Sequence, residues 1–166
     1  PVGMHPLLPP AWWASRSLPA VLLLAALTAG RSAAGEATPA EVLAGVRSFF
    51  EKTARPDGSF RPGIDPDYQG ISDSAYSDLA PVTYAVVLHR TFGWKLPHEA
   101  KTRAFLLSRQ RQDGAFFNVK GTVDPRSAQA RVYNTTQGLV ALHALGVKPR
   151  YDPLPVFAAV LAGDYK

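Results

Sequence analysis

The chain repeats one short segment, and this repeat constrains its fold more than any other feature. Asp57-Gly58-Ser59-Phe60 returns as Asp113-Gly114-Ala115-Phe116 at an offset of 56 residues (113 − 57), and each copy follows an apolar helical pattern. The glycines that end the next helices, Gly93 and Gly146, are 53 residues apart (146 − 93). The loop between each turn and its next helix therefore differs in length by three residues between the two copies. A repeat of this length is typical of stacked helical modules that cannot bury their apolar faces alone.

The N-terminal region has the pattern of an export signal. Arg16 precedes the apolar run 18–27, and Ser32-Ala33-Ala34 offers the small residues of a cleavage site. The run is shorter than the roughly 20 residues that span a bilayer. We therefore expect residues 1–34 to be a signal peptide with Met4 as the true start, and the protein to be periplasmic or extracellular. An uncleaved anchor is the alternative.

The remaining residues, 35–166, amount to one domain. Removing Arg16 and Arg31 from the 18 basic residues leaves 16 (18 − 2) against 13 acidic ones, and the basic residues are scattered. Because no basic stripe with interleaved aromatic residues is present, we expect no nucleic-acid partner, and a membrane contact only through the leader. The chain has no Cys, which excludes disulfides and thiolate chemistry.

Caps and apolar periodicity predict helices alternating with loops. Thr38-Pro39-Ala40-Glu41 is a capping box that starts a first helix, which Pro56 closes. Residues 61–70 are rich in Pro and Gly and are predicted to form a loop. The same signals predict four further helices: from Ser77-Asp78 to Gly93, from Pro97 to the Asp113-Gly114 stop, from the cap Asn134-Thr135-Thr136-Gln137 to Gly146, and from Pro153 to Ala162. The last begins a third unit that the chain does not finish.

The second copy of the repeat resembles a known motif. From Phe105 to Phe116 an apolar helix end is followed by Gln110, a short spacer and Gly-x-Phe. This order resembles the QW-type repeat of the squalene–hopene cyclase and protein prenyltransferase superfamily, with Phe in place of Trp. The first copy has Thr53 or Ala54 where Gln is expected. The resemblance covers roughly residues 40–163.

The resemblance implies an all-α fold of helical hairpins, a piece of the α/α toroid in which about five to seven hairpins close into a ring. It gives a structural role, in which the Gln bridges backbone groups at a helix end, to the motif residues Asp57, Gly58, Phe60, Gln110, Asp113, Gly114 and Phe116. The first copy, without Gln, is interpreted as a degenerate terminal cap. Two units and a fraction cannot close a ring, so we expect a partial ring with exposed apolar flanks and possible self-association.

The catalytic chemistry of the superfamily needs residues that this chain lacks or holds only in part. Class II cyclases protonate an alkene with a DxDD motif, but Asp65-Pro66-Asp67-Tyr68 lacks the final Asp and fits a turn. Zinc prenyltransferases bind the metal through Asp, Cys and His, and here His89, His98 and His143 show no ligand spacing. We therefore predict no catalytic residue, no cofactor and no metal site.

Three groups of side chains have a functional interpretation beside a structural one. They are the loop carboxylates Asp65, Asp67, Asp73 and Asp78 as Ca²⁺ ligands, the tyrosines Tyr68, Tyr76, Tyr84 and Tyr133 as walls of an aromatic cavity, and the arginines Arg103, Arg109, Arg111 and Arg131 as an anion site. In each group the structural interpretation is favoured: turns and caps, apolar core, and solvated helix ends, respectively.

Together these patterns favour an exported helical-repeat module that binds an unknown protein or an apolar small molecule without catalysing a reaction. Two alternatives stay open. In the first, the chain would be the N-terminal part of a class II terpene cyclase-like enzyme whose catalytic residues lie beyond Lys166. In the second, it would be a toroid of the polysaccharide lyase type. In the second case Arg or Lys would neutralise an acidic sugar and abstract a proton.

Overall fold

The computed structural model describes residues 36–163, and within this range the fold is all-α, as predicted. The described residues contain helices α2 to α7, no strand, and two isolated β-bridges. The chain divides after Pro39, and the residues from Ala40 onward form one compact unit. No helix between residues 36 and 163 has the length and hydropathy that crossing a membrane requires. The predicted signal peptide lies outside the described residues.

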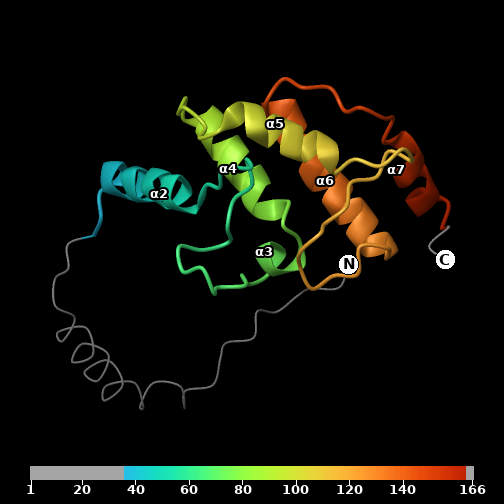
Figure 1. Ribbon diagram of the computed structural model, residues 1–166, viewed down its shortest axis with the longest axis horizontal. Helices are drawn as coiled ribbons and strands as arrows, with labels where there is room; N and C mark the ends of the chain where they lie inside the picture. The colour runs from blue at the N-terminus through green and yellow to red at the C-terminus, as the bar shows by residue number, and fades with distance from the viewer. Residues whose placement is uncertain (1–35, 164–166) are drawn as a thin grey trace, which may run out of the picture. The chain divides into compact units, whose positions relative to one another are not determined.

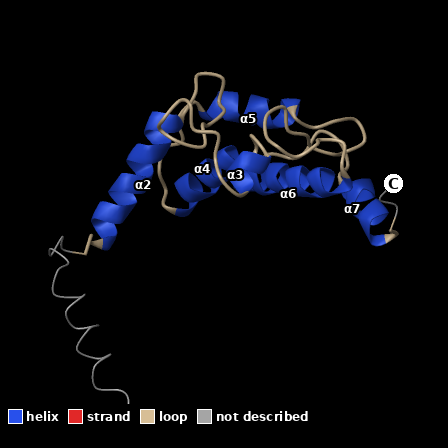
Figure 2. Ribbon diagram, turned by 90° about the horizontal axis from the view of Figure 1, so that it is seen from below, coloured by secondary structure: helices blue, strands red, loops and turns tan. Residues whose placement is uncertain are grey.

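Within this unit the helices form two layers. Their bounds are α2 (Pro39–Thr53), α3 (Asp73–Tyr76), α4 (Ala80–Thr91), α5 (Glu99–Ser108), α6 (Ala128–Ala144) and α7 (Leu154–Leu161). Helices α4 and α6 lie side by side, with α2 and α7 at opposite ends of the pair (Figure 1). Helix α5 and the loops beside it cover one side of α4 and α6 (Figure 2). The opposite side of this pair is therefore not covered by another described helix.

The core sits between the two layers. It contains Val82 and Val86 of α4, Leu106 of α5 and Leu142 of α6, all at most 1% exposed. Burying a side chain of this size contributes roughly 1.5–3 kcal/mol. Between α4 and α6 the Thr83 hydroxyl also donates a hydrogen bond of 3.0 Å to the carbonyl oxygen of Gln137. This bond fixes the position of α4 along the axis of α6.

The two copies of the repeated segment fold alike, as turn 1 (residues 53–61) and turn 2 (residues 109–117). The amide of Arg55 donates to the Ser59 carbonyl at 2.9 Å, and the equivalent amide of Arg111 donates to the Ala115 carbonyl at 2.8 Å. Each turn buries its phenylalanine, since Phe60 is 2% exposed and Phe116 is fully buried. The repeat in sequence is thus a repeat of backbone conformation.

Glycine is required in both turns for two separate reasons. Gly58 and Gly114 have φ angles of 88° and 85°, in the left-handed region that favours glycine. Each also packs against the backbone of the next unit, Gly58 against α5 and Gly114 against the segment before α7. A Cβ at Gly58 would overlap the backbone of Lys101 and Thr102, and one at Gly114 would overlap the carbonyl of Asp152.

The ends of α4 and α6 repeat as well, at the offset of 53 residues. The amide of Trp94 donates to the His89 carbonyl at 2.8 Å, and that of Val147 donates to the Leu142 carbonyl at 2.9 Å. These bonds span five residues across a left-handed glycine, which is the Schellman arrangement at a helix C-terminus. The predicted stops at glycine are therefore confirmed for both helices.

One predicted helix start was wrong, because the cap lies earlier than the sequence pattern indicated. Helix α6 begins at Ala128, where the Ser127 hydroxyl oxygen accepts a bond of 3.1 Å from the Ala130 amide. The predicted cap, Asn134, lies inside the helix and donates a 2.8 Å bond to the side-chain oxygen of Asn118. An Asn in a helix interior is uncommon unless its side chain has such a partner.

The other predicted bounds agree more closely with the structure. Helix α2 begins at Pro39 as expected, and α7 lies within the predicted range. Helix α4 begins after the predicted start, with Pro81 in its first turn, and α5 begins after His98, which has a φ of 52°. The short helix α3 lies just beyond the predicted loop and was missed, because four residues carry no helical period.

Candidate functional site

Gln110 links turn 2 to the segment that leads into α7. Its side-chain oxygen accepts bonds from the amides of Arg150 at 2.7 Å and Tyr151 at 3.0 Å. Its side-chain nitrogen donates to the carbonyls of Tyr151 at 2.7 Å and Gly114 at 3.2 Å. The side chain is 6% exposed, so these bonds are shielded from water. Gln110 therefore bridges two successive units as well as holding its own turn.

Turn 1 is linked to the next unit by a different residue. Ala54 occupies the position of Gln110 (54 + 56 = 110) and has no side-chain amide. Instead, the buried hydroxyl of Thr102 in α5 donates a bond of 2.9 Å to the carbonyl of Gly58. Turn 1 is thus linked to the next unit by a side chain of α5, whereas turn 2 is linked by its own residue Gln110.

The aspartates of both turns have structural roles. One side-chain oxygen of Asp57 accepts the amide of Ser59 at 2.9 Å and its hydroxyl at 2.7 Å. The equivalent oxygen of Asp113 accepts the amide of Ala115 at 3.1 Å. Burial alone would raise the pKa of the Asp57 carboxyl, but the Ser59 hydrogen bonds and the nearby Arg55 outweigh it and lower the pKa below its ordinary value.

An apolar groove runs between α4 and α6, which we term the α4–α6 groove. It has a volume of about 390 Å³ and is lined by Thr83, Tyr84, Val87, Leu88, Thr136, Gln137 and Val140. Tyr84 and Val140 are 39% and 44% exposed, so the groove opens to solvent. Its volume lies within the range of roughly 300–1,000 Å³ that is typical of small-molecule sites.

The end of the groove near α3 is polar. The Tyr84 hydroxyl donates a short bond of 2.6 Å to a carboxylate oxygen of Asp73. Burial and this carboxylate raise the pKa of Tyr84. Burial also raises the pKa of the Tyr133 hydroxyl far above its ordinary value, and Tyr84 and Asp73 raise it further. The Tyr133 hydroxyl therefore keeps its proton at neutral pH and can act as a hydrogen-bond donor.

Three buried polar atoms of α6 have no hydrogen-bond partner among the described residues. They are the hydroxyl of Tyr133 and the side-chain oxygens of Asn134 and Gln137. An unsatisfied buried group costs about 1–3 kcal/mol, so native proteins usually satisfy it with water or a ligand. Tyr133 and Gln137 are four residues apart, and positions four apart lie on one face of a helix. Against the larger effect of burial, the Gln137 side chain also acts to lower the pKa of the Tyr133 hydroxyl, so the two side chains lie close together.

Two of the four tyrosines predicted as cavity walls share one pocket. Tyr76 and Tyr133 line a cavity of about 160 Å³ together with Asp73 and Asn134. Tyr84 is hydrogen-bonded to Asp73 and lines the adjacent groove, so three of the four surround one carboxylate. Tyr68 lines a separate pocket beside turn 1.

The structure separates the loop carboxylates instead of bringing them together. Asp65 accepts the amide of Asp67 at 2.9 Å, Asp73 accepts the Tyr84 hydroxyl, and Asp78 pairs with Arg109 at 3.0 Å. The carboxylates of Asp65, Asp73 and Asp78 thus have local structural roles. Within residues 36–163 no group of three His, Asp or Glu side chains converges on a point where a metal could bind.

The histidine of α4 is a core residue. His89 is 1% exposed, and its ring nitrogen Nδ1 lies 2.6 Å from the carbonyl oxygen of Ala85. The rings of Phe50 and Trp94 meet it edge to face, each with its centroid 5.7 Å away. These neighbours give His89 a packing role.

The four arginines of the predicted anion site divide into two groups. Arg103 pairs with Glu99 at 2.7 Å, and Arg109 pairs with Asp78 while its guanidinium lies over a phenylalanine ring. Arg111 and Arg131 do come together, because both lie beside Asp113. Sequence reasoning missed Arg126, which faces the same pocket from the loop before α6.

Comparison of the chain with protein-family models, curated proteins and solved structures gives no match. The fold and the site therefore define a class by geometry alone: an all-α protein of repeated helix–turn–helix units with an open groove between neighbouring helices.

Proposed function

We propose that the protein is an exported binding module built as part of an α/α toroid, and that the α4–α6 groove binds an apolar small molecule carrying one hydrogen-bonding group. In such a toroid α4 and α6 would be neighbouring inner helices, and α2, α5 and α7 outer helices. The repeated turns and the parallel inner pair support this arrangement. Export is proposed from the sequence pattern of the leader, in which Arg16 precedes the apolar run 18–27 and Ser32-Ala33-Ala34 follows it.

The observation that carries the proposal is the meeting of an apolar groove with unsatisfied polar atoms. Val87, Leu88 and Val140 supply apolar walls, and burying a ligand's apolar surface against them yields about 25 cal/mol per Å². Gln137 lines the groove and its side-chain oxygen offers an acceptor, while the Tyr133 hydroxyl, which belongs to the adjacent pocket between α3 and α6, offers a donor. An alcohol can satisfy both at once, because a hydroxyl both donates and accepts.

The groove is tested by titrating the full chain with farnesol, an isoprenoid alcohol, and measuring affinity by calorimetry. Val140→Asp places a charge in the apolar wall and is expected to weaken binding by at least about tenfold, because the charge must be desolvated. Val42→Asp is the matched control, since Val42 is 51% exposed on α2, outside the groove. Equal affinities for wild type and Val140→Asp would contradict the proposal.

The polar end is tested separately with Tyr133→Phe, which removes only the hydroxyl. We expect affinity for farnesol to fall about fivefold, the value of one modest hydrogen bond, while affinity for the hydrocarbon of the same skeleton stays unchanged. An equal loss for both ligands would mean that Tyr133 shapes the groove without recognising the hydroxyl.

A further inference from the structure

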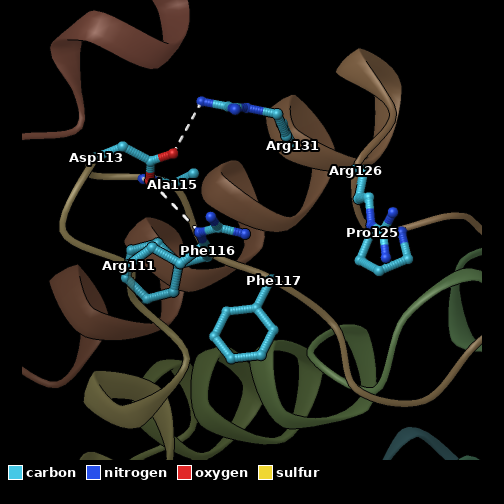
Figure 3. Close-up of a pocket in the computed structure, with 8 residues that line it drawn as sticks. All are labelled: Arg111, Asp113, Ala115, Phe116, Phe117, Pro125, Arg126 and Arg131. Carbon is cyan, nitrogen blue, oxygen red and sulfur yellow. Dashed lines mark hydrogen bonds and ion pairs between the residues drawn. The ribbon is translucent and has the colours of Figure 1, made fainter.

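A second pocket, which we term the arginine pocket, lies between turn 2 and the N-terminal end of α6 (Figure 3). It has a volume of about 260 Å³ and is separate from the α4–α6 groove, because the two share no lining residue. Arg111 comes from turn 2, Arg126 from the loop before α6, and Arg131 from the first turns of α6 itself. Three different segments thus bring guanidinium groups to one cavity.

The arginine pocket carries an excess of positive charge. Its lining residues include three arginines and one carboxylate, that of Asp113, which gives the lining a formal charge of +2 (3 − 1). The pocket also lies at the N-terminal end of the 17-residue helix α6, where the helix dipole adds positive potential. The excess of arginine charge and the helix dipole both favour an anionic ligand.

Asp113 positions the guanidinium groups without using up their donors. One of its oxygens accepts a bond of 3.2 Å from Arg131, and the other lies 3.9 Å from the side-chain Nε of Arg111 and also accepts the Ala115 amide. A guanidinium has about five N–H donors, so most remain for a ligand. Because turn 2 holds the carboxylate, two arginines are oriented before any ligand arrives.

The rest of the lining is apolar. Phe117 and Pro125 stand beside the arginines and provide flat surfaces against which a ring can pack (Figure 3). An inorganic anion would use the guanidinium groups and leave these surfaces unused. The planar fork of Arg matches a carboxylate by paired hydrogen bonds.

We propose that the arginine pocket binds a compact organic acid, whose carboxylate meets Arg126 and Arg131 while its apolar body packs against Phe117 and Pro125. This site is independent of the proposed groove ligand. A bound ligand would contact turn 2, the same turn that Gln110 links to the segment before α7.

The test is an NMR titration of the full chain with benzoate, following the side-chain N–H signals of the three arginines and the amide of Ala115. We expect saturable shifts in these signals. Benzamide has the same shape without the charge and should bind at least about tenfold more weakly, the usual value of a charge-assisted bond. Equal binding of benzamide would overturn the proposal.

Arg126→Gln removes one charge from an exposed loop and leaves the pair between Asp113 and Arg131 in place. It is expected to weaken benzoate binding by about tenfold. Arg103→Gln is the matched control, because Arg103 pairs with Glu99 outside the pocket, and should leave affinity unchanged. Unchanged affinity in Arg126→Gln, or inorganic phosphate binding as tightly as benzoate, would overturn the assignment to an organic acid.

Discussion

Turn 1 and turn 2 have the same backbone conformation, but different hydrogen bonds link them to the next unit. In turn 2 the amide of Gln110 makes four hydrogen bonds, three of them to the segment before α7. In turn 1 the equivalent residue is Ala54, and one bond from Thr102 to the Gly58 carbonyl takes its place. The Asp-Gly-x-Phe residues therefore determine the backbone conformation of the repeat, whereas Thr102 and Gln110 make the links between units.

The pockets beside the two turns differ in a related way. The pocket at turn 1 is larger, about 360 Å³, and also contains basic side chains. There Arg61 donates a 2.8 Å bond to the carbonyl of Lys52, and Asp78 pairs with Arg109. Arg61 and Asp78 at turn 1 thus help to hold the fold, while at turn 2 the guanidinium groups gather around a cavity. The same turn therefore supports a structural role in one unit and a candidate binding site in the other.

The largest expected effect comes from filling the glycine positions. Gly114→Ala should lower the free energy of unfolding by at least about 3 kcal/mol, because a left-handed φ is strained for Ala and the new Cβ overlaps Asp152. Gly58→Ala should cost a similar amount. Gly146→Ala is the control: its φ is 66° but a Cβ meets nothing within 4 Å, so about 1 kcal/mol is expected. Equal losses at all three sites in urea denaturation would contradict the close packing of the turns.

The next largest effect separates the two turns. Gln110→Ala removes four buried hydrogen bonds and should lower the free energy of unfolding by about 2–4 kcal/mol, measured by urea denaturation. The reverse exchange, Ala54→Gln, should not stabilise turn 1, because Thr102 already bonds to that turn. A stabilising Ala54→Gln would show that the two positions are interchangeable.

A smaller loss is expected from the single bond that anchors turn 1. Thr102→Val keeps the shape of the side chain but leaves the Gly58 carbonyl without its partner, for an expected cost of about 1–2 kcal/mol in thermal or urea unfolding. Thr91→Val is a suitable control, because its hydroxyl bonds only to its own helix and is exposed. If both substitutions cost the same, Thr102 has no special role between units.

The smallest effect is a pH dependence confined to turn 1. The folded protein holds the pKa of Asp57 below its ordinary value of 3.8, so its contribution to stability is present above that value and is lost as the pH falls through the lower, folded pKa. Asp57→Asn should therefore flatten the acid limb of the stability curve. Ser59→Ala, which keeps the carboxylate but removes one of its bonds, should flatten it in part. An unaltered acid limb in Asp57→Asn would disprove this contribution.

The sequence predicted most of the helices, because their signals are local. Pro39 starts a helix, Gly93 and Gly146 end helices, and both Asp-Gly turns form as expected. The start of α6 was misplaced because Asn134 has the composition of a cap, and only its partner Asn118 explains its place inside the helix. That contact joins the interior of α6 to the loop that precedes it, 16 residues away, and leaves no local signal.

The candidate sites were less predictable for the same reason. Tyr84 and Tyr133 were identified as possible cavity residues, but Gln137 was interpreted as part of a helix cap, because the predicted start of α6 at Asn134 left Tyr133 outside the helix. Arg111 and Arg131 were grouped with Arg103, which the structure assigns to a pair with Glu99. The Arg103–Glu99 pair has the i,i+4 spacing of a helical ion pair, whereas Arg131 pairs with Asp113 across 18 residues, which spacing along the chain does not predict.

The link made by Gln110 is tested most directly by amide hydrogen exchange in the full chain. The amides of Arg150 and Tyr151 donate to Gln110, so they should be protected in the wild type and exchange much faster in Gln110→Ala. In the same variant the amide of Arg61, which closes turn 1, should keep its wild-type rate. Unchanged protection of Arg150 and Tyr151 in Gln110→Ala would contradict the claim that this residue fastens turn 2 to the next unit.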